Sequence, residues 1–223
     1  MPLIAPPCDD PEAAPGGLRG SGAYPQVSMA VNAHFRSSTD RLVIPIGRGL
    51  ARAGITPNAL TTIGLLGVVL GMGLLLAGHP ILGGWIAAGA TALDALDGTV
   101  ARLTDTQSEV GAFYDSVADR VADATIFSAY AWVVREDPLL FGLIMVAFAS
   151  ALITSYIRAK AESLGWDATV GIIERPERVI IILPAIGFGF FAWGAWILAV
   201  GGVVTIGQRL WAVYKQARGA ARV

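Results

Sequence analysis

An uninterrupted stretch without Asp, Glu, Lys or Arg runs from Asn58 to Leu93, and it restricts the fold of this chain more than any other feature. A membrane-spanning helix needs about 20 mainly apolar residues. The stretch is therefore long enough for most of two spans. Gly78, His79 and Pro80 interrupt it and predict a break between the two helices.

The composition agrees with a membrane protein. Hydrophobic residues make up 54% of the chain and charged residues 15%, whereas about 25% of the residues in a soluble domain are charged. This balance leaves too little polar surface to cover a water-soluble globule, and it excludes disorder of the whole chain. The formal net charge is −1, so nothing indicates a nucleic-acid partner. With Cys8 as its one cysteine, the chain cannot form an internal disulfide or a Cys-rich zinc site.

Later apolar segments predict four more spans. Residues 111–134 and 139–157 form one each. Residues 179–208 are too long for one span and are expected to form two, separated by a tight turn at residues 193–196. The last helix is expected to continue to Tyr214. The fold class predicted is therefore an all-α integral membrane protein with six transmembrane helices.

The placement of Lys and Arg supports six spans. With six, nearly all of these residues fall on one side of the membrane, and Arg135 lies alone on the other. Cytoplasmic loops carry the excess of Lys and Arg. Both termini of a multi-pass cell-membrane protein are therefore expected in the cytoplasm. An arrangement of five helices would place the C-terminal cationic cluster outside.

The N-terminal region differs from the rest. Proline and glycine crowd residues 1–28, and their density opposes both helix and strand. We expect a disordered tail over these residues and a membrane domain over residues 29–223. Within that domain, residues 38–53 predict an amphipathic helix in the membrane interface, with Arg48 among the cations that face lipid headgroups. The alternative is a short amphipathic connector packed on protein.

Acidic residues gather where the second predicted span ends and the third begins. They recur at spacings of three and four, which place side chains on one helical face. The connector, residues 103–110, is short, so the two helices are expected to be antiparallel neighbours and to bring four carboxylates together. The two stripes are Asp94, Asp97, Gly98, Ala101 and Arg102 on the first helix, and Gly111, Asp115 and Asp119 on the second.

Four neighbouring anions repel one another strongly in a low-dielectric environment. Arg102 supplies one positive charge, which is too little. Divalent metal resolves the repulsion, and all-oxygen ligands favour Mg²⁺ or Mn²⁺. Two ions about 3.5–4 Å apart are the arrangement that holds a phosphate during displacement. The alternatives are a proton or cation pathway in a transporter, and a helix pair held by salt bridges.

The spacing D-x2-D-G-x2-A-R-x8-G-x3-D-x3-D, from Asp94 to Asp119, resembles the signature of the CDP-alcohol phosphatidyltransferases. The resemblance covers the layout from Ile55 to Tyr214. It implies six transmembrane helices, a homodimer, and exchange of the CMP of a CDP-linked lipid for an alcohol. It also implies that Asp94, Asp97, Asp115 and Asp119 bind two Mg²⁺ or Mn²⁺ ions.

The resemblance further assigns roles by position. Asp119 would take the proton from the acceptor hydroxyl. The run that begins at Asn58 matches positions that contact the nucleotide, although without the resemblance it favours a simple N-cap provided by Thr56 or Asn58. The residues implied in binding the CDP-lipid are Asn58, Ala59, Leu60, Thr61, Gly98, Arg102 and Ser108.

Two further segments, residues 155–162 and 174–178, resemble the phosphatidylinositol phosphate synthase branch and its archaeal archaetidylinositol phosphate counterpart. That branch uses 1D-myo-inositol 3-phosphate as acceptor. A phosphorylated acceptor needs cations, and arginine can bind phosphate with two hydrogen bonds. The resemblance implies that Arg158, Arg178 and Arg209 bind the acceptor phosphate, with Lys160 and Arg175 in support. Positive-inside topology alone also accounts for these cations.

The implied activity is transfer of the phosphatidyl group of CDP-diacylglycerol to inositol phosphate within membrane lipid, giving phosphatidylinositol phosphate and CMP. Three alternatives remain open. The first alternative is that glycerol 3-phosphate is the acceptor, as in a phosphatidylglycerophosphate synthase. The second is that the donor carries archaeal ether lipids, as in an archaetidylinositol phosphate synthase. Outside the family, the four carboxylates would suit a divalent-cation transporter.

Overall fold

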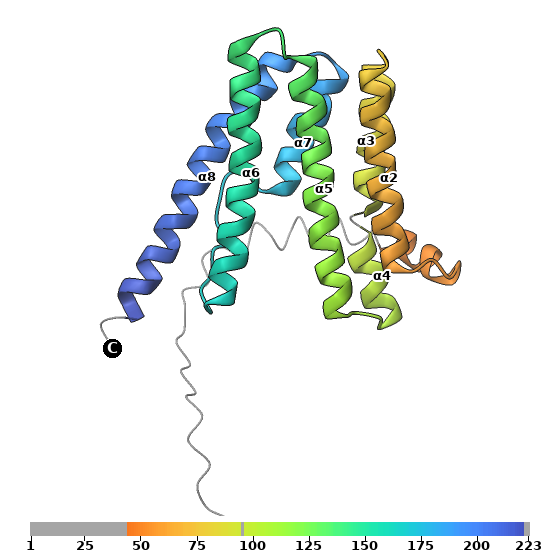
Figure 1. Ribbon diagram of the computed structural model, residues 1–223. Coiled ribbons are helices and arrows are strands. Elements are labelled where there is room, and N and C mark those ends of the chain that lie inside the picture. Colours follow the sequence, from red (N-terminus) through yellow and green to blue (C-terminus); the bar gives the residue numbers. More distant parts are fainter. Residues whose placement is uncertain (1–43, 95, 221–223) are drawn as a thin grey trace, which may run out of the picture. The chain divides into compact units, whose positions relative to one another are not determined.

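The computed structural model describes residues 44–94 and 96–220, and helices are the only regular structure in these ranges (Figure 1). The predicted N-terminal tail lies outside the described residues. Residues 44–52 are helical. The helices that follow are α2 (Pro57–Leu76), α3 (Pro80–Asp94), α4 (Asp97–Thr104), α5 (Glu109–Val133), α6 (Pro138–Ser163), α7 (Arg175–Gly187) and α8 (Phe191–Ala220).

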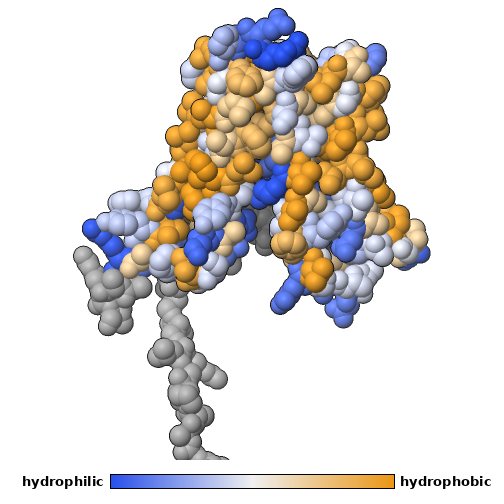
Figure 2. Space-filling view, viewed as in Figure 1, coloured by the Kyte–Doolittle hydropathy of each residue, from blue (hydrophilic) through white to orange (hydrophobic). Residues whose placement is uncertain are grey.

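The long helices pack as neighbours within one bundle. Figure 1 shows α5 between the α2–α3 pair and the α6–α8 pair, and α7 contacts both α3 and α8. Three of the described helices, α2, α6 and α8, are long and apolar enough to cross a membrane. On the face drawn in Figure 2, hydrophobic residues dominate the middle and hydrophilic residues gather toward the two ends. An all-helical membrane protein is therefore confirmed at this level.

The predicted break in the first apolar stretch is confirmed. α2 ends at Leu76, α3 begins at Pro80, and Gly78 between them has a φ of +89°. The two helices then approach to backbone contact. A Cβ atom on Gly83 would lie 2.3 Å from the carbonyl oxygen of Gly71, a distance that excludes any side chain.

Residues 44–52 pack on α4. A Cβ atom on Gly47 would lie 3.0 Å from Cγ2 of Thr99 and 3.3 Å from Leu103. The segment is not fully covered, since Ile46 is 53% exposed. The segment therefore has one face against protein and another free to meet lipid. Residues 38–43, the first part of the segment expected to form this helix, lie outside the described residues.

Two expectations about helix ends are wrong. The second span does not continue through Asp97, because α3 ends at Asp94 and the separate helix α4 begins at Asp97. A carboxylate in the first turn of a helix is favoured by the helix dipole, which suits Asp97 at this new start. The tight turn expected at residues 193–196 is also wrong, because these residues lie inside α8.

The chain turns instead at residues 188–190, where Gly189 has a φ of +77°. Glycine adopts this left-handed conformation at little cost. Gly194, which suggested the turn, has a different role. A Cβ atom there would lie 2.5 Å from Cβ of Ala185 and 2.9 Å from the hydroxyl of Tyr130. This glycine therefore permits close packing of α8 on its neighbours.

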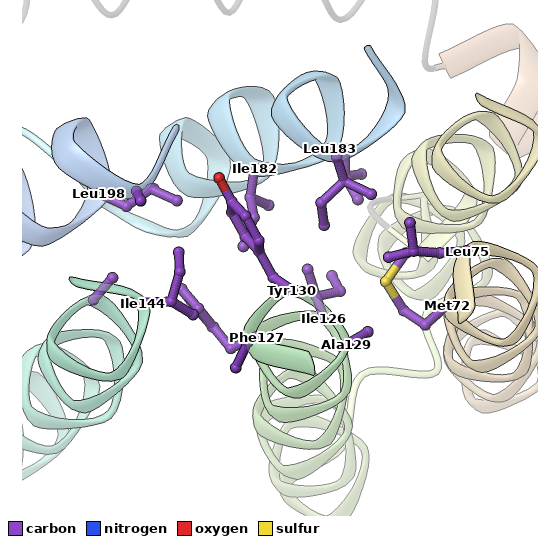
Figure 3. Packing of buried hydrophobic residues seen from close by; sticks show 14 of the residues in the cluster. Met72, Leu75, Ile126, Phe127, Ala129, Tyr130, Ile144, Ile182, Leu183 and Leu198 are labelled. Carbon is purple, nitrogen blue, oxygen red and sulfur yellow. The ribbon is translucent and has the colours of Figure 1, made fainter. Parts of the chain in front are cut away.

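The hydrophobic core surrounds Tyr130 of α5 (Figure 3). Its ring packs near Phe191, and its hydroxyl donates a hydrogen bond to the backbone oxygen of that residue. Figure 3 shows Ile144 of α6 and Leu198 of α8 on one side of α5, with Met72 of α2 on the other. The core thus occupies the C-terminal half of α5, and Asp115 and Asp119 lie in the N-terminal half of this helix.

Candidate active site

The structure brings three of the four motif aspartates together. Asp94, Asp97 and Asp115 each offer a carboxylate oxygen, and these atoms all lie within 4.8 Å of one another. Asp94 ends α3, Asp97 begins α4, and Asp115 lies near the start of α5. Because they come from three helices, their carboxylates approach one point from different directions. Such a set of hard oxygen donors fits Mg²⁺ or Mn²⁺.

Asp119 is linked to this group by Arg175, which forms ion pairs with both Asp119 and Asp94. Nη2 of Arg175 lies 2.6 Å from Oδ1 of Asp119 and 3.4 Å from Oδ2 of Asp94. Arg120 lies farther away, at 3.6 Å from Oδ2 of Asp119. Oδ1 of Asp119 is buried, and none of the described residues meets it with hydrogen-bond geometry. Asp119 therefore faces the guanidinium of Arg175, and it is not one of the three aspartates whose oxygens converge.

α2 holds two of the aspartates in place. Oγ1 of Thr61 donates a hydrogen bond to Oδ2 of Asp97 at 2.6 Å, and this threonine is buried. A Cβ atom on Gly64, one turn later, would lie 2.8 Å from Cβ of Asp94. The sequence motif contains neither residue.

A pocket of about 690 Å³ opens beside these carboxylates, with Asp97 and Asp115 in its wall. Most of the residues expected to bind the CDP-lipid line it. Ala59 and Leu60 do not, and Leu60 instead packs in a buried cluster with Leu96 and Val100. Lining residues that the motif did not indicate include Thr106, Gln107 and Glu109. The expected residues that line the pocket are Asn58, Thr61, Gly98, Arg102 and Ser108.

The starts of two helices meet at this pocket. Thr56 caps α2 by accepting a hydrogen bond from the backbone N–H of Ala59, as one reading of this run expected. Ser108 caps α5 by accepting one from Gly111 at 3.0 Å. Backbone N–H groups at the start of a helix favour anions. The pocket therefore combines two such helix starts with the guanidinium of Arg102 beside the carboxylates.

Each of the three expected acceptor arginines has a partner within the protein. Arg178 is buried and donates to Oδ2 of Asp123 at 2.8 Å. Arg209 is also buried, and its guanidinium donates to protein oxygens. Arg158 is exposed and pairs with Glu162 at 2.9 Å. Asp123, which the motif does not include, is thus the direct partner of Arg178.

An apolar groove of about 1110 Å³ lies between α2, α5 and α6. Its lining includes Val69, Phe113, Val117, Leu152 and Tyr156. Phe113 and Val117 follow the pocket residues Ala112 and Asp115 on α5. The groove therefore begins on the face of α5 next to the pocket.

This chain is similar to known proteins in both sequence and fold. The family model of the CDP-alcohol phosphatidyltransferases matches residues 54–213. Phosphatidylinositol phosphate synthase of Mycobacterium marinum is 37% identical over 197 residues, which cover 80% of this chain and 82% of that protein. The synthase of Streptomyces avermitilis is 33% identical over 220 residues, which cover 91% of this chain and 90% of that protein.

Solved structures of the Mycobacterium tuberculosis phosphatidylinositol phosphate synthase are similar in fold to this chain. A crystal structure with CDP-DAG bound has a TM-score of 0.71 and 33% identity, and the match covers 78% of this chain and 94% of that one. A crystal structure in complex with manganese and citrate also has a TM-score of 0.71, with 34% identity, and covers 77% and 88% of the two chains.

Proposed function

The chain belongs to the CDP-alcohol phosphatidyltransferase family, and from this premise we propose that it transfers the phosphatidyl group of CDP-diacylglycerol to 1D-myo-inositol 3-phosphate. It is an enzyme of phospholipid biosynthesis, and the products are phosphatidylinositol phosphate and CMP. The observation that carries the reaction type is the pocket walled by Asp97 and Asp115. The choice of acceptor is supported by the relatives, which are phosphatidylinositol phosphate synthases.

The CDP-lipid binds in the 690 Å³ pocket with its nucleotide among Asn58, Gly98, Arg102 and Ser108. The helix starts at Thr56 and Ser108 face the diphosphate with backbone N–H groups. The adjacent groove gives the lipid tails an apolar path from the pocket to the membrane. A related enzyme of this fold has been crystallised with CDP-DAG bound, which supports this donor.

Asp94, Asp97, Asp115 and Asp119 hold two Mg²⁺ or Mn²⁺ ions. Divalent ions at this site supply electrostatic stabilisation of the diphosphate and of the departing CMP. Asp119 accepts the proton of the inositol hydroxyl. The hydroxyl oxygen then forms a bond with the lipid-side phosphorus as the bond from that phosphorus to the CMP oxygen breaks. Manganese in the crystal structure of a relative supports a divalent metal here.

In the membrane, α2, α3, α5, α6, α7 and α8 form six spans, and both termini lie in the cytoplasm. α3 has 15 residues and α7 has 13, so these two helices are shorter than the about 20 residues of a typical span. Residues 44–52 lie in the interface, with Ile46 toward the acyl chains. Two copies of the chain associate as a homodimer.

Release of CMP from CDP-diacylglycerol, measured with a panel of acceptors, tests the proposed function. We expect turnover with inositol phosphate and none with glycerol 3-phosphate or free inositol. Turnover with glycerol 3-phosphate alone would make the chain a phosphatidylglycerophosphate synthase. A donor panel with CDP-archaeol separates the archaeal alternative. Metal uptake into proteoliposomes without CMP release would favour a transporter.

Replacing Arg178 with alanine should raise the KM for inositol phosphate about thirtyfold and leave the KM for CDP-diacylglycerol within about twofold of wild type. Losing one partner of a charged hydrogen-bonded contact costs about 2–5 kcal/mol. Initial rates at varied concentrations of each substrate measure the effect. The single variant leaves Asp123 buried without its partner, so the double variant Asp123→Ala/Arg178→Ala serves as the control for folding. An equal rise in both KM values would contradict the acceptor role.

A further inference from the structure

Four polar side chains on one face of α8 contact the segment that leads into α7. This segment, residues 165–174, joins α6 to α7 without regular structure, and we call it the α6–α7 segment. The four side chains follow one another at intervals of three, one and seven residues, which places them on one helical face. They are Thr205, Gln208, Arg209 and Gln216.

Their contacts are mainly with the backbone of the segment. Gln216 accepts a hydrogen bond from the N–H of Asp167 at 2.9 Å, and it donates one to the carbonyl oxygen of the same residue at 2.6 Å. Gln208 accepts from the N–H of Ile172, and Thr205 accepts from the N–H of Ile173, both at 3.1 Å. The side chains thus replace the backbone partners that a helix or strand would provide.

Arg209 adds the largest set of contacts. Its Nε donates to the carbonyl oxygen of Val170 at 2.9 Å, and its Nη1 donates to that of Thr154 on α6 at 2.6 Å. Its Nη2 donates to Oε1 of Glu174 at 2.8 Å. One buried guanidinium therefore joins α6, the α6–α7 segment and the residue just before α7.

The segment also packs tightly on α8. Gly171 has a φ of +151°, and a Cβ atom there would lie 2.4 Å from Cγ2 of Thr205. In the opposite direction, a Cβ atom on Gly201 of α8 would lie 2.2 Å from Cδ1 of Ile173. Neither glycine has room for a side chain of its own, and this close fit gives the segment one depth and one register on α8.

The position of the segment determines where α7 begins. Glu174 caps α7 in a capping box with Glu177, and its carbonyl oxygen accepts a hydrogen bond from the N–H of Arg178. The first turn of α7 then directs Arg175 toward Asp94 and Asp119 and directs Arg178 toward Asp123. A shift of the α6–α7 segment would move both arginines.

We infer that Thr205, Gln208 and Gln216 are positioning residues, which hold the α6–α7 segment so that Arg175 and Arg178 meet the phosphorylated acceptor. The inference rests on the proposed function, since it takes Arg178 to be an acceptor residue. None of the three side chains lines the candidate pocket or contacts the motif aspartates. They act on the reaction only through the segment.

The two glutamines give a sharp test, because Gln208 contacts the segment through its amide oxygen alone, whereas Gln216 uses both its amide oxygen and its amide nitrogen. Gln208 only accepts from the segment, so Gln208→Glu should behave as wild type while Gln208→Leu should raise the KM for the acceptor. Gln216 both accepts and donates, so Gln216→Glu and Gln216→Leu should both raise it. Loss of one hydrogen bond of about 1 kcal/mol corresponds to about fivefold. Lys215→Leu, at the next residue, is the matched control because the described contact of Lys215 is with Trp211.

KM values for CDP-diacylglycerol and for the acceptor are measured for each variant, together with hydrogen–deuterium exchange of residues 165–174. In Gln208→Leu, we expect faster hydrogen–deuterium exchange of residues 165–174. We also expect the KM for the acceptor to rise while the KM for CDP-diacylglycerol stays unchanged. Unchanged exchange would overturn the inference, and so would faster exchange with both KM values raised equally or both unchanged.

The acceptor panel is first run on the wild-type protein. The acceptor that the wild type uses is then the one whose concentration is varied in the KM measurements on the variants. A wild type that turns over only glycerol 3-phosphate would therefore overturn the proposed acceptor without deciding the role of α8. The exchange rates and the ratio of variant KM to wild-type KM still decide it.

Discussion

Asparagine in place of Asp119 is expected to lower CMP release by about a hundredfold to ten-thousandfold, the range typical for loss of a general base. The change removes the group proposed to take the proton of the acceptor and one proposed metal ligand. It should not unfold the protein, since Arg175, which loses its charged partner at 2.6 Å, keeps Asp94 at 3.4 Å. The measurement is CMP release at saturating substrates, with elution volume and helical circular dichroism as checks of folding.

Asp105→Asn is the matched control for this variant. Asp105 ends α4 in the left-handed conformation, with a φ of 53°, and asparagine tolerates that conformation as well as aspartate does. It lies outside the candidate pocket. The control should therefore keep wild-type turnover. Near-normal CMP release from Asp119→Asn would show that another group takes the proton.

Removal of divalent ions is expected to stop turnover completely, and Mg²⁺ or Mn²⁺ added back should restore it. Asp94, Asp97 and Asp115 offer oxygens within 4.8 Å of one another, and without cations the repulsion of these carboxylates opposes binding of an anionic diphosphate. Turnover after treatment with a chelator, followed by titration with each ion, measures the effect. A Ca²⁺ titration separates recovery of charge alone from recovery of catalysis.

Direct binding makes the metal prediction independent of activity. A Mn²⁺ titration followed by electron paramagnetic resonance should give two ions per chain, and Asp97→Asn should weaken their binding. A single ion per chain would reject the two-ion arrangement. Activity that persists in excess chelator would reject metal-assisted transfer altogether.

Much of the fold could be predicted because it depends on local patterns. The length of each apolar stretch and the glycine and proline at its ends predicted most helices, and Gly78 with Pro80 correctly predicted the break between α2 and α3. The turn before α8 was misplaced because Gly189 and Gly194 look alike in a sequence. Only the tertiary contacts distinguish the glycine with positive φ from the glycine that packs on Ala185.

The candidate site, too, could be predicted only in part. The residue spacing correctly predicted that Asp94, Asp97 and Asp115 lie near one another, because all three belong to helices that follow one another along the chain through short connectors. Spacing did not reveal which cation faces Asp119. Arg175 lies far along the chain, and its approach depends on how the α6–α7 segment is held on α8. Ion pairs between distant elements, such as Arg178 with Asp123, leave no periodic signal in the sequence.

The backbone contact between Gly71 and Gly83 limits how the bundle can adapt to its donor. α2 and α3 have no side chains there that could repack, so these two helices must move together. The apolar groove lies on α2 but has its other walls on α5 and α6. Bulkier or branched acyl chains would therefore have to displace α5 or α6, and variants that loosen those two helices are the place to look for a broader choice of lipid.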